Sequence, residues 1–182
     1  MPTFPTTRSS ERRRGDAGFT LIEIGLVMLI IGLVLALAVP RFRDQGRAEL
    51  MSQTRKLAAT FRFLQQEAIL NGRVYRLNYD LDQQRYFVTE AELGDAFLPS
   101  TGILARDVTL PSTVQLADID VPDLGGKIYE GTGFTHFFPD GYVDPTVVHL
   151  ANGEEAYTLF VPNGLTGRAH VSAGYLDLGS RS

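Results

Sequence analysis

The fold is decided by the stretch Gly18-Phe19-Thr20-Leu21-Ile22-Glu23, which opens an apolar run over residues 19–39. The only charged residue in that run is Glu23. At about 1.5 Å per residue, a helix of this length spans roughly 31 Å, which matches the hydrocarbon core of a bilayer. The run therefore predicts a transmembrane helix over residues 19–39.

The segment before this run is polar and basic. Residues 1–18 show no apolar periodicity, as is typical of a disordered tail. Its charged residues are Arg8, Glu11, Arg12, Arg13, Arg14 and Asp16. Basic residues beside a span favour the cytoplasmic side, so we expect the N-terminus inside and the rest of the chain exported. Arg41, Arg43 and Arg47 beyond the run weaken this signal.

Glu23 needs a positive partner, because a carboxylate in an apolar membrane helix costs on the order of 3 kcal/mol. Cleavage between Gly18 and Phe19 would create an α-amine four residues before Glu23, about 6 Å away along the helix axis. That amine, on the same helix or on a neighbouring subunit, is the nearest counter-charge. The glutamate thus predicts a cut after Gly18.

Three other interpretations of the N-terminal region are open. A secretory signal peptide could be cut after Ala36-Leu37-Ala38, although its apolar part would be long and would contain a glutamate. A twin-arginine export signal could use Arg12-Arg13, although the residues that follow match weakly. A single-span anchor could remain uncut. The charge of Glu23 favours cleavage after Gly18.

Residues 40–71 predict an amphipathic continuation of the helix. Apolar residues form one stripe at helical spacing, namely Leu50, Leu57, Ala58, Phe61, Leu64 and Ala68. Polar residues fill the other faces, namely Arg47, Glu49, Gln53, Arg55, Lys56, Arg62, Gln65 and Gln66. The stripe should pack on a globular domain. Pro40 should kink or loosen the helix, and Asn71-Gly72 should end it.

Residues 72–182 predict a β domain. Residues 74–79 and 85–89 should form a hairpin, and residues 91–107 should form a long loop. Further β-like runs lie at 108–110, 113–117, 127–129, 134–138, 146–150, 156–161 and 168–172. Asn152-Gly153 and Asn163-Gly164 are strong turn signals. The fold class is therefore α+β, with the helix packed on a small antiparallel β-sandwich whose core includes Phe134, Phe137 and Phe138.

The composition argues against several kinds of chemistry. There is no cysteine, which excludes disulfides and thiolate metal sites, and the formal charge of −4 is a poor footprint for nucleic acid. His136, His149 and His170 have no metal-ligand spacing. The acidic pairs Glu154-Glu155 and Asp118/Asp120 should lie on a solvated surface. Because no catalytic or cofactor motif is present, we expect no enzyme, no cofactor and no metal.

The opening motif, with its basic leader and long apolar run, resembles the processing signal of type IV pilins and type II secretion pseudopilins. Three later segments are similar to the GspH/FimT group of minor pseudopilins and pilins: Phe137-Phe138-Pro139-Asp140-Gly141, Tyr157-Thr158-Leu159-Phe160-Val161 and Gly164-Leu165-Thr166-Gly167-Arg168. The chain is identified as a member of that group.

This resemblance implies a processed, membrane-anchored subunit. Prepilin peptidase would remove residues 1–18 and N-methylate Phe19, and Glu23 and Phe19 would guide assembly. Residues 19–39 would lie in the bacterial inner membrane, with residues 72–182 in the periplasm. The implied function is a minor pseudopilin near the tip of the type II secretion pseudopilus, with other major and minor pseudopilins and secreted cargo as partners. Pro139, Asp140, Gly141, Gly167 and Arg168 would be diagnostic turn residues without a catalytic role.

The alternative is a minor type IV pilin of the FimT kind, used in pilus priming or DNA uptake. DNA uptake would need a basic patch that meets phosphates. The related DNA binders carry a second basic residue directly after the Gly-Arg pair, where this chain has Ala169-His170. We therefore do not expect nucleic acid as a partner.

Overall fold

The structure is a computed structural model that describes residues 20–91, 96–100, 107–122 and 125–177, with the backbone alone described over residues 38–45. The chain divides into two compact units, Met1–Arg41 and Phe42–Ser182. One helix, α1 (Leu21–Asn71), supplies the described helical residues of the first unit and the opening of the second. It continues through Pro40, so the long helix is confirmed, and the kink there stays a prediction.

Helix α1 ends where the sequence predicted. Gly72 takes a φ of 66°, a left-handed conformation that suits glycine, and its N–H donates to the carbonyl of Ala68 at 3.0 Å. No helix within the described residues has the length and apolar content needed to cross a bilayer.

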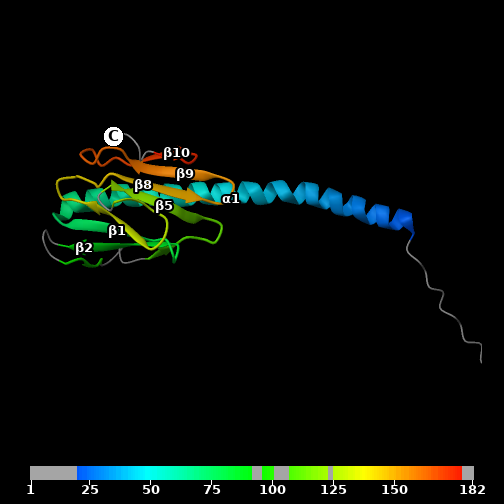
Figure 1. The fold of residues 1–182 in the computed structure, drawn as a ribbon, viewed down its shortest axis with the longest axis horizontal. Coiled ribbons are helices and arrows are strands. Elements are labelled where there is room, and N and C mark those ends of the chain that lie inside the picture. The colour runs from blue at the N-terminus through cyan, green and yellow to red at the C-terminus, as the bar shows by residue number, and fades with distance from the viewer. Residues whose placement is uncertain (1–19, 92–95, 101–106, 123–124, 178–182) are drawn as a thin grey trace, which may run out of the picture. The chain divides into compact units, whose positions relative to one another are not determined.

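The second unit contains two antiparallel sheets, each of five strands in the described residues (Figure 1). The first sheet has the order β3 (Leu98–Pro99), β2 (Arg85–Ala91), β1 (Val74–Asp80), β7 (Thr132–Phe137), and β4 (Val108–Thr109) also pairs with β2. The second has the order β10 (His170–Ala173), β9 (Ala156–Val161), β8 (Thr146–Ala151), β5 (Gln115–Val121), β6 (Gly126–Ile128). A helix combined with antiparallel sheets confirms the α+β class.

Two predicted hairpins are present. β1 and β2 pair from Val74 opposite Ala91 to Asp80 opposite Arg85. β8 and β9 pair around Asn152-Gly153, where Gly153 has a φ of 87° and the Asn152 N–H donates to the carbonyl of Glu155 at 3.0 Å. The predicted loop over residues 91–107 contains short strand β3, and its residues 92–95 and 101–106 lie outside the described residues.

The prediction for β5 was wrong in its bounds, which were placed at residues 113–117. The strand runs from Gln115 to Val121, and its register with β8 shifts between Leu116 and Asp118. This β-bulge interrupts the alternation of inward and outward side chains, so Asp118 and Ile119 are both buried although they are adjacent. A strict period of two therefore fails to reveal this strand.

One hydrophobic core joins α1 to both sheets. All six residues of the predicted helical stripe are buried, and they share the core with side chains such as Leu77 of β1 and Leu150 of β8. Phe61 packs edge to face on Phe137, with 5.3 Å between ring centroids. This geometry is the favourable one for two aromatic rings.

The burial of three side chains differs from the prediction. Phe134 and Phe138 are half-exposed, because Gly133, Thr135 and Phe137 take the inward positions of β7. Gln53, predicted on a polar face, is buried. It lies three residues after Leu50 and four before Leu57, so it falls within the stripe, where its amide donates to Glu49 at 2.7 Å.

Replacing Phe61 by alanine should lower the free energy of unfolding by about 3–5 kcal/mol, because the side chain is 1% exposed and its loss opens a cavity against Phe137. Phe63→Ala on the same helix is the matched control, since Phe63 is 37% exposed and its loss should cost about 1 kcal/mol or less. Urea denaturation of the purified chain measures both values. Equal losses for the two variants would contradict the placement of Phe61 in the core.

Candidate functional site: an apolar helix and two turns

The start of α1 is fixed by Thr20. Its carbonyl accepts hydrogen bonds from the N–H groups of Glu23 at 3.0 Å and Ile24 at 3.2 Å, and its hydroxyl lies 3.3 Å from the Glu23 nitrogen. Threonine is favoured at this capping position. Glu23 thus stands in the first turn, where the helix dipole favours a carboxylate by about 0.3–1 kcal/mol.

Gly18 and Phe19 lie outside the described residues. Cleavage between them, methylation of Phe19 and its role in assembly therefore stay predictions. Glu23 is described, and its side chain is exposed.

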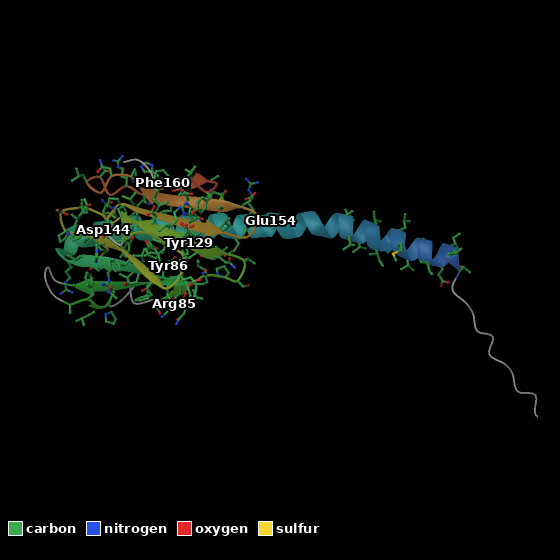
Figure 2. The ribbon with its side chains drawn as sticks, viewed as in Figure 1. Arg85, Tyr86, Tyr129, Asp144, Glu154 and Phe160 are labelled. Atoms are coloured by element: carbon green, nitrogen blue, oxygen red, sulfur yellow. The ribbon has the colours of Figure 1, made fainter. Side chains whose placement is uncertain are left out.

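The first half of α1 exposes apolar side chains on all sides of the helix (Figure 2). Each large apolar residue whose side chain is described there is at least 47% exposed: Leu21, Ile22, Ile24, Leu26, Val27, Met28, Leu29, Ile30, Ile31, Leu33, Val34, Leu35 and Leu37. A helix that is apolar all round belongs inside a larger protein assembly or a membrane. This segment is therefore the candidate assembly surface.

The two predicted diagnostic turns are well-formed. In the first, the Gly141 N–H donates to the Phe138 carbonyl at 2.9 Å, and the Tyr142 N–H donates to the Asp140 carboxylate at 3.0 Å. In the second, the Gly167 N–H donates to the Asn163 carbonyl at 3.1 Å. Gly141 has a φ of 87° and Gly167 a φ of 57°, so both positions favour glycine. Pro139 is half-exposed and Arg168 is exposed.

Gln65 of α1 brings these two turns together. Its side-chain amide nitrogen donates to the carbonyl of Gly141 at 2.9 Å and to that of Thr166 at 3.2 Å. A Cβ atom at Gly167 would collide with this amide. Gln65 was predicted only as a polar-face residue, although its position four after Phe61 and three before Ala68 is the signal that it borders the buried stripe.

The prediction that Asp118 lies on a solvated surface was wrong. Asp118 is 2% exposed, and its carboxylate accepts a hydrogen bond from the Tyr175 hydroxyl at 2.8 Å. The Nδ1 atom of His149, which is fully buried, lies 2.7 Å from the same carboxylate, and its Nε2 lies 2.9 Å from the Leu176 carbonyl. The ring of Tyr175 stacks on His149 at 3.8 Å. Burial raises the pKa of the Tyr175 hydroxyl, which keeps it a donor.

The other three residues of the two predicted acidic pairs are less buried. Asp120 is half-exposed, Glu154 is exposed, and Glu155 forms an ion pair with Arg47 at 3.4 Å. In the ranges that the structure describes, no group of three His, Asp or Glu side chains is placed to hold a metal ion. The buried contacts of Asp118 and His149 instead fasten the segment Gly174–Asp177 to the second sheet.

Comparison with known proteins shows which of them this chain resembles. No family model matches the chain. The chain is 28% identical over 157 residues to type II secretion system protein H of Aeromonas hydrophila, covering 79% of this chain and 85% of that protein. The chain is therefore a homologue of protein H.

Two shorter matches also confirm the predicted resemblance. Protein H of Pseudomonas aeruginosa is 41% identical over 71 residues, and protein H of Klebsiella pneumoniae is 31% identical over 80 residues, each match covering less than half of either chain. Two solved structures of EpsH, a minor pseudopilin of the type 2 secretion system of Vibrio cholerae, have TM-scores of 0.54 and 0.57 at 17% identity. They cover 69% and 71% of this protein H homologue and 97% of the EpsH chain, which shows that the fold is shared.

In this protein H homologue, Gly167→Ala should lower the free energy of unfolding by about 3 kcal/mol, because a methyl group meets Gln65 and Val143 at a positive φ. Gly72→Ala is the control: its φ is 66°, but nothing lies within 4 Å of the added methyl, so the loss should be about 1 kcal/mol. Thermal and urea unfolding of the purified chain measure the difference. A Gly167→Ala variant no less stable than Gly72→Ala would contradict the contact.

Proposed function

We propose that the chain is a minor pseudopilin, a structural subunit of a type II secretion pseudopilus that assists export of folded proteins across the outer membrane. The observation that carries this proposal is the match to protein H of Aeromonas hydrophila, which extends over 85% of that protein. The shared fold with EpsH supports it. The relatives are structural pseudopilins, and we infer a structural role without enzymatic activity here.

Assembly would depend on α1. Burial of one large apolar side chain stabilises a complex by roughly 1.5–3 kcal/mol, and the first half of the helix exposes such side chains on every side. We infer that residues 19–39 anchor the subunit in the inner membrane, N-terminus in the cytoplasm, and then pack against helices of other major and minor pseudopilins. The supporting observation is that the large apolar side chains described over residues 21–37 are all exposed.

Processing would supply the counter-charge for Glu23. Prepilin peptidase would cut after Gly18 and methylate Phe19, leaving an amine one helical turn before the carboxylate. The Thr20 cap supports this proposal, because it places Glu23 in the first turn of the helix. The amine of Phe19 on this or a neighbouring subunit would then pair with Glu23 in the filament.

The β domain would work outside the membrane. We infer that residues 72–182 form a pilin-like sandwich in the periplasm, near the tip of the pseudopilus, and contact other minor pseudopilins and secreted cargo. Support comes from the sheets and the helix stripe, which share one core.

Deletion of the gene in the bacterium that makes this chain should abolish secretion of folded exoproteins and leave twitching motility intact, because the chain would serve secretion and not pilus retraction. Exoprotein activity in the culture medium and motility on agar measure the two outcomes. Loss of motility with normal secretion would instead support a minor type IV pilin of the FimT kind. Complementation with the full-length gene controls for effects on neighbouring genes.

Gly18→Ala should leave the precursor uncut, because the peptidase would cleave directly after that glycine. Immunoblots of membrane fractions would show a single species that migrates as the longer chain. Gly15→Ala, a like substitution in the same leader, is the matched control and should mature normally. Normal maturation of Gly18→Ala would refute the proposed cleavage site.

A further inference from the structure

The outward side of β7 is aromatic, whereas a solvated sheet face is ordinarily polar. Phe134 and His136 occupy outward positions of β7, and Phe138 follows the strand. Arg76 of β1 lies directly opposite His136 in the register, and Phe97 lies beside β3. We call Arg76, Phe97, Phe134, His136 and Phe138 the aromatic face. All five are half-exposed.

The rings of the aromatic face form a contiguous row. His136 lies at its centre, with ring centroids 4.9 Å from Phe134, 5.4 Å from Phe97 and 5.8 Å from Phe138. Pro99 of β3 pairs with Thr89, which pairs with Arg76, so exposed Pro99 lies on the same side of the sheet as the row. Aromatic residues and arginine are the residue types enriched at the energetic centres of protein interfaces.

Arg76 is held in place by this row. Its guanidinium carbon lies 4.1 Å from the ring centroid of Phe97 and 5.1 Å from that of Phe134. Its Nε donates to the Thr89 hydroxyl at 3.3 Å, and among the described residues its outer N–H groups donate to no carboxylate. Partial burial lowers the pKa of Arg76 from its ordinary value, as expected for a partly desolvated cation.

The other arginine of these strands has carboxylate partners. Arg85 pairs with Asp80 at 3.4 Å and also with Asp107. The Nδ1 atom of His136 lies 2.8 Å from the carboxylate of Asp144, labelled in Figure 2. Within the described part of the chain, Arg76 forms no ion pair. A rigid, partly desolvated guanidinium without a carboxylate is preorganised to bind one, because little ordering entropy remains to be lost.

The charges of the chain indicate which kind of molecule could supply an acceptor for Arg76. A two-fold contact with a second copy would bring this cationic face against itself, and its acidic residues Asp80 and Asp144 are already paired. Phosphates of a nucleic acid would meet a chain with a net charge of −4. A carboxylate on another polypeptide, with apolar neighbours to pack on the phenylalanines, satisfies both Arg76 and the rings.

We propose that the aromatic face binds a different protein chain through an aspartate or glutamate that pairs with Arg76, while apolar residues beside that carboxylate pack on Phe97, Phe134 and Phe138. The inference rests on the proposed function, in which the β domain contacts other proteins, and it assigns one such contact to the aromatic face; it does not involve the apolar half of α1. Secretion and precursor processing test the function, and the contact of this face is tested independently.

The experiment places the photoreactive amino acid p-benzoylphenylalanine at position 99 of the full chain, in the bacterium that makes it. Pro99 is exposed on the same side of the sheet as Arg76 and is not one of the five residues of the face, so the replacement leaves Arg76 and the rings in place. Illumination should yield an adduct with another protein, and mass spectrometry of the joined peptides should find an aspartate or glutamate with apolar neighbours at the contact. Arg76→Gln should lower the adduct yield at least about tenfold.

Two controls decide the outcome. Arg62→Gln, the same change at an exposed arginine of α1, should leave the adduct yield unchanged. Replacing the identified carboxylate of the partner by its amide should reduce the yield as Arg76→Gln does, even where Arg76→Gln affects folding. Replacing that carboxylate by lysine together with Arg76→Glu should restore it. The proposal would be overturned by the absence of an adduct or by an adduct with a second copy of this chain. It would also be overturned if the adduct yield did not change when Arg76 or the partner carboxylate is replaced.

Discussion

The buried stripe on the second half of α1 is the surface on which both sheets close. Leu57 and Leu64 are fully buried, and Phe61 between them meets Phe137 of β7. The apolar surface of this stripe is buried against strands of the same chain, which the hydrophobic effect favours. The described apolar side chains of the first half of the helix are instead exposed on every side. The second half of α1, apolar on one side, therefore serves the folding of the chain itself. The first half, apolar on every side, is left to associate with other molecules.

Local patterns in the sequence predicted most of the secondary structure. The spacing of the helical stripe, the Asn71-Gly72 stop and the hairpin at Asn152-Gly153 each depend on neighbours within a few residues, so they could be recognised without a fold. The bounds of β5 could not, because a bulge breaks its alternation. Phe134 and Phe138 were misplaced for a related reason: their chemistry suits a core, and only the register of β7 shows that Phe137 takes the inward position.

The turns of the candidate site could be predicted in the same way, because Gly141 and Gly167 belong to turns whose residue types are distinctive. The short motif that contains Gly18 and Glu23 predicts a processing site, and that site stays a prediction. Contacts between distant segments carried no such signal. The pair of Asp118 and His149 joins residues on β5 and β8, and the position of Arg76 opposite His136 depends on the pairing of β1 with β7. Such contacts follow from topology, which the composition of either strand does not reveal.

The side-chain amide of Gln65 limits how far the lengths of two turns can change. A side-chain amide has two hydrogens, and here the nitrogen that carries them serves the carbonyls of Gly141 and Thr166, on turns that lie 76 and 101 residues further along the chain. Lengthening either turn would withdraw its carbonyl and leave a hydrogen without an acceptor. The lengths of the two loops are thus tied to each other and to the identity of residue 65, so that a change in one loop requires a compensating change on the helix.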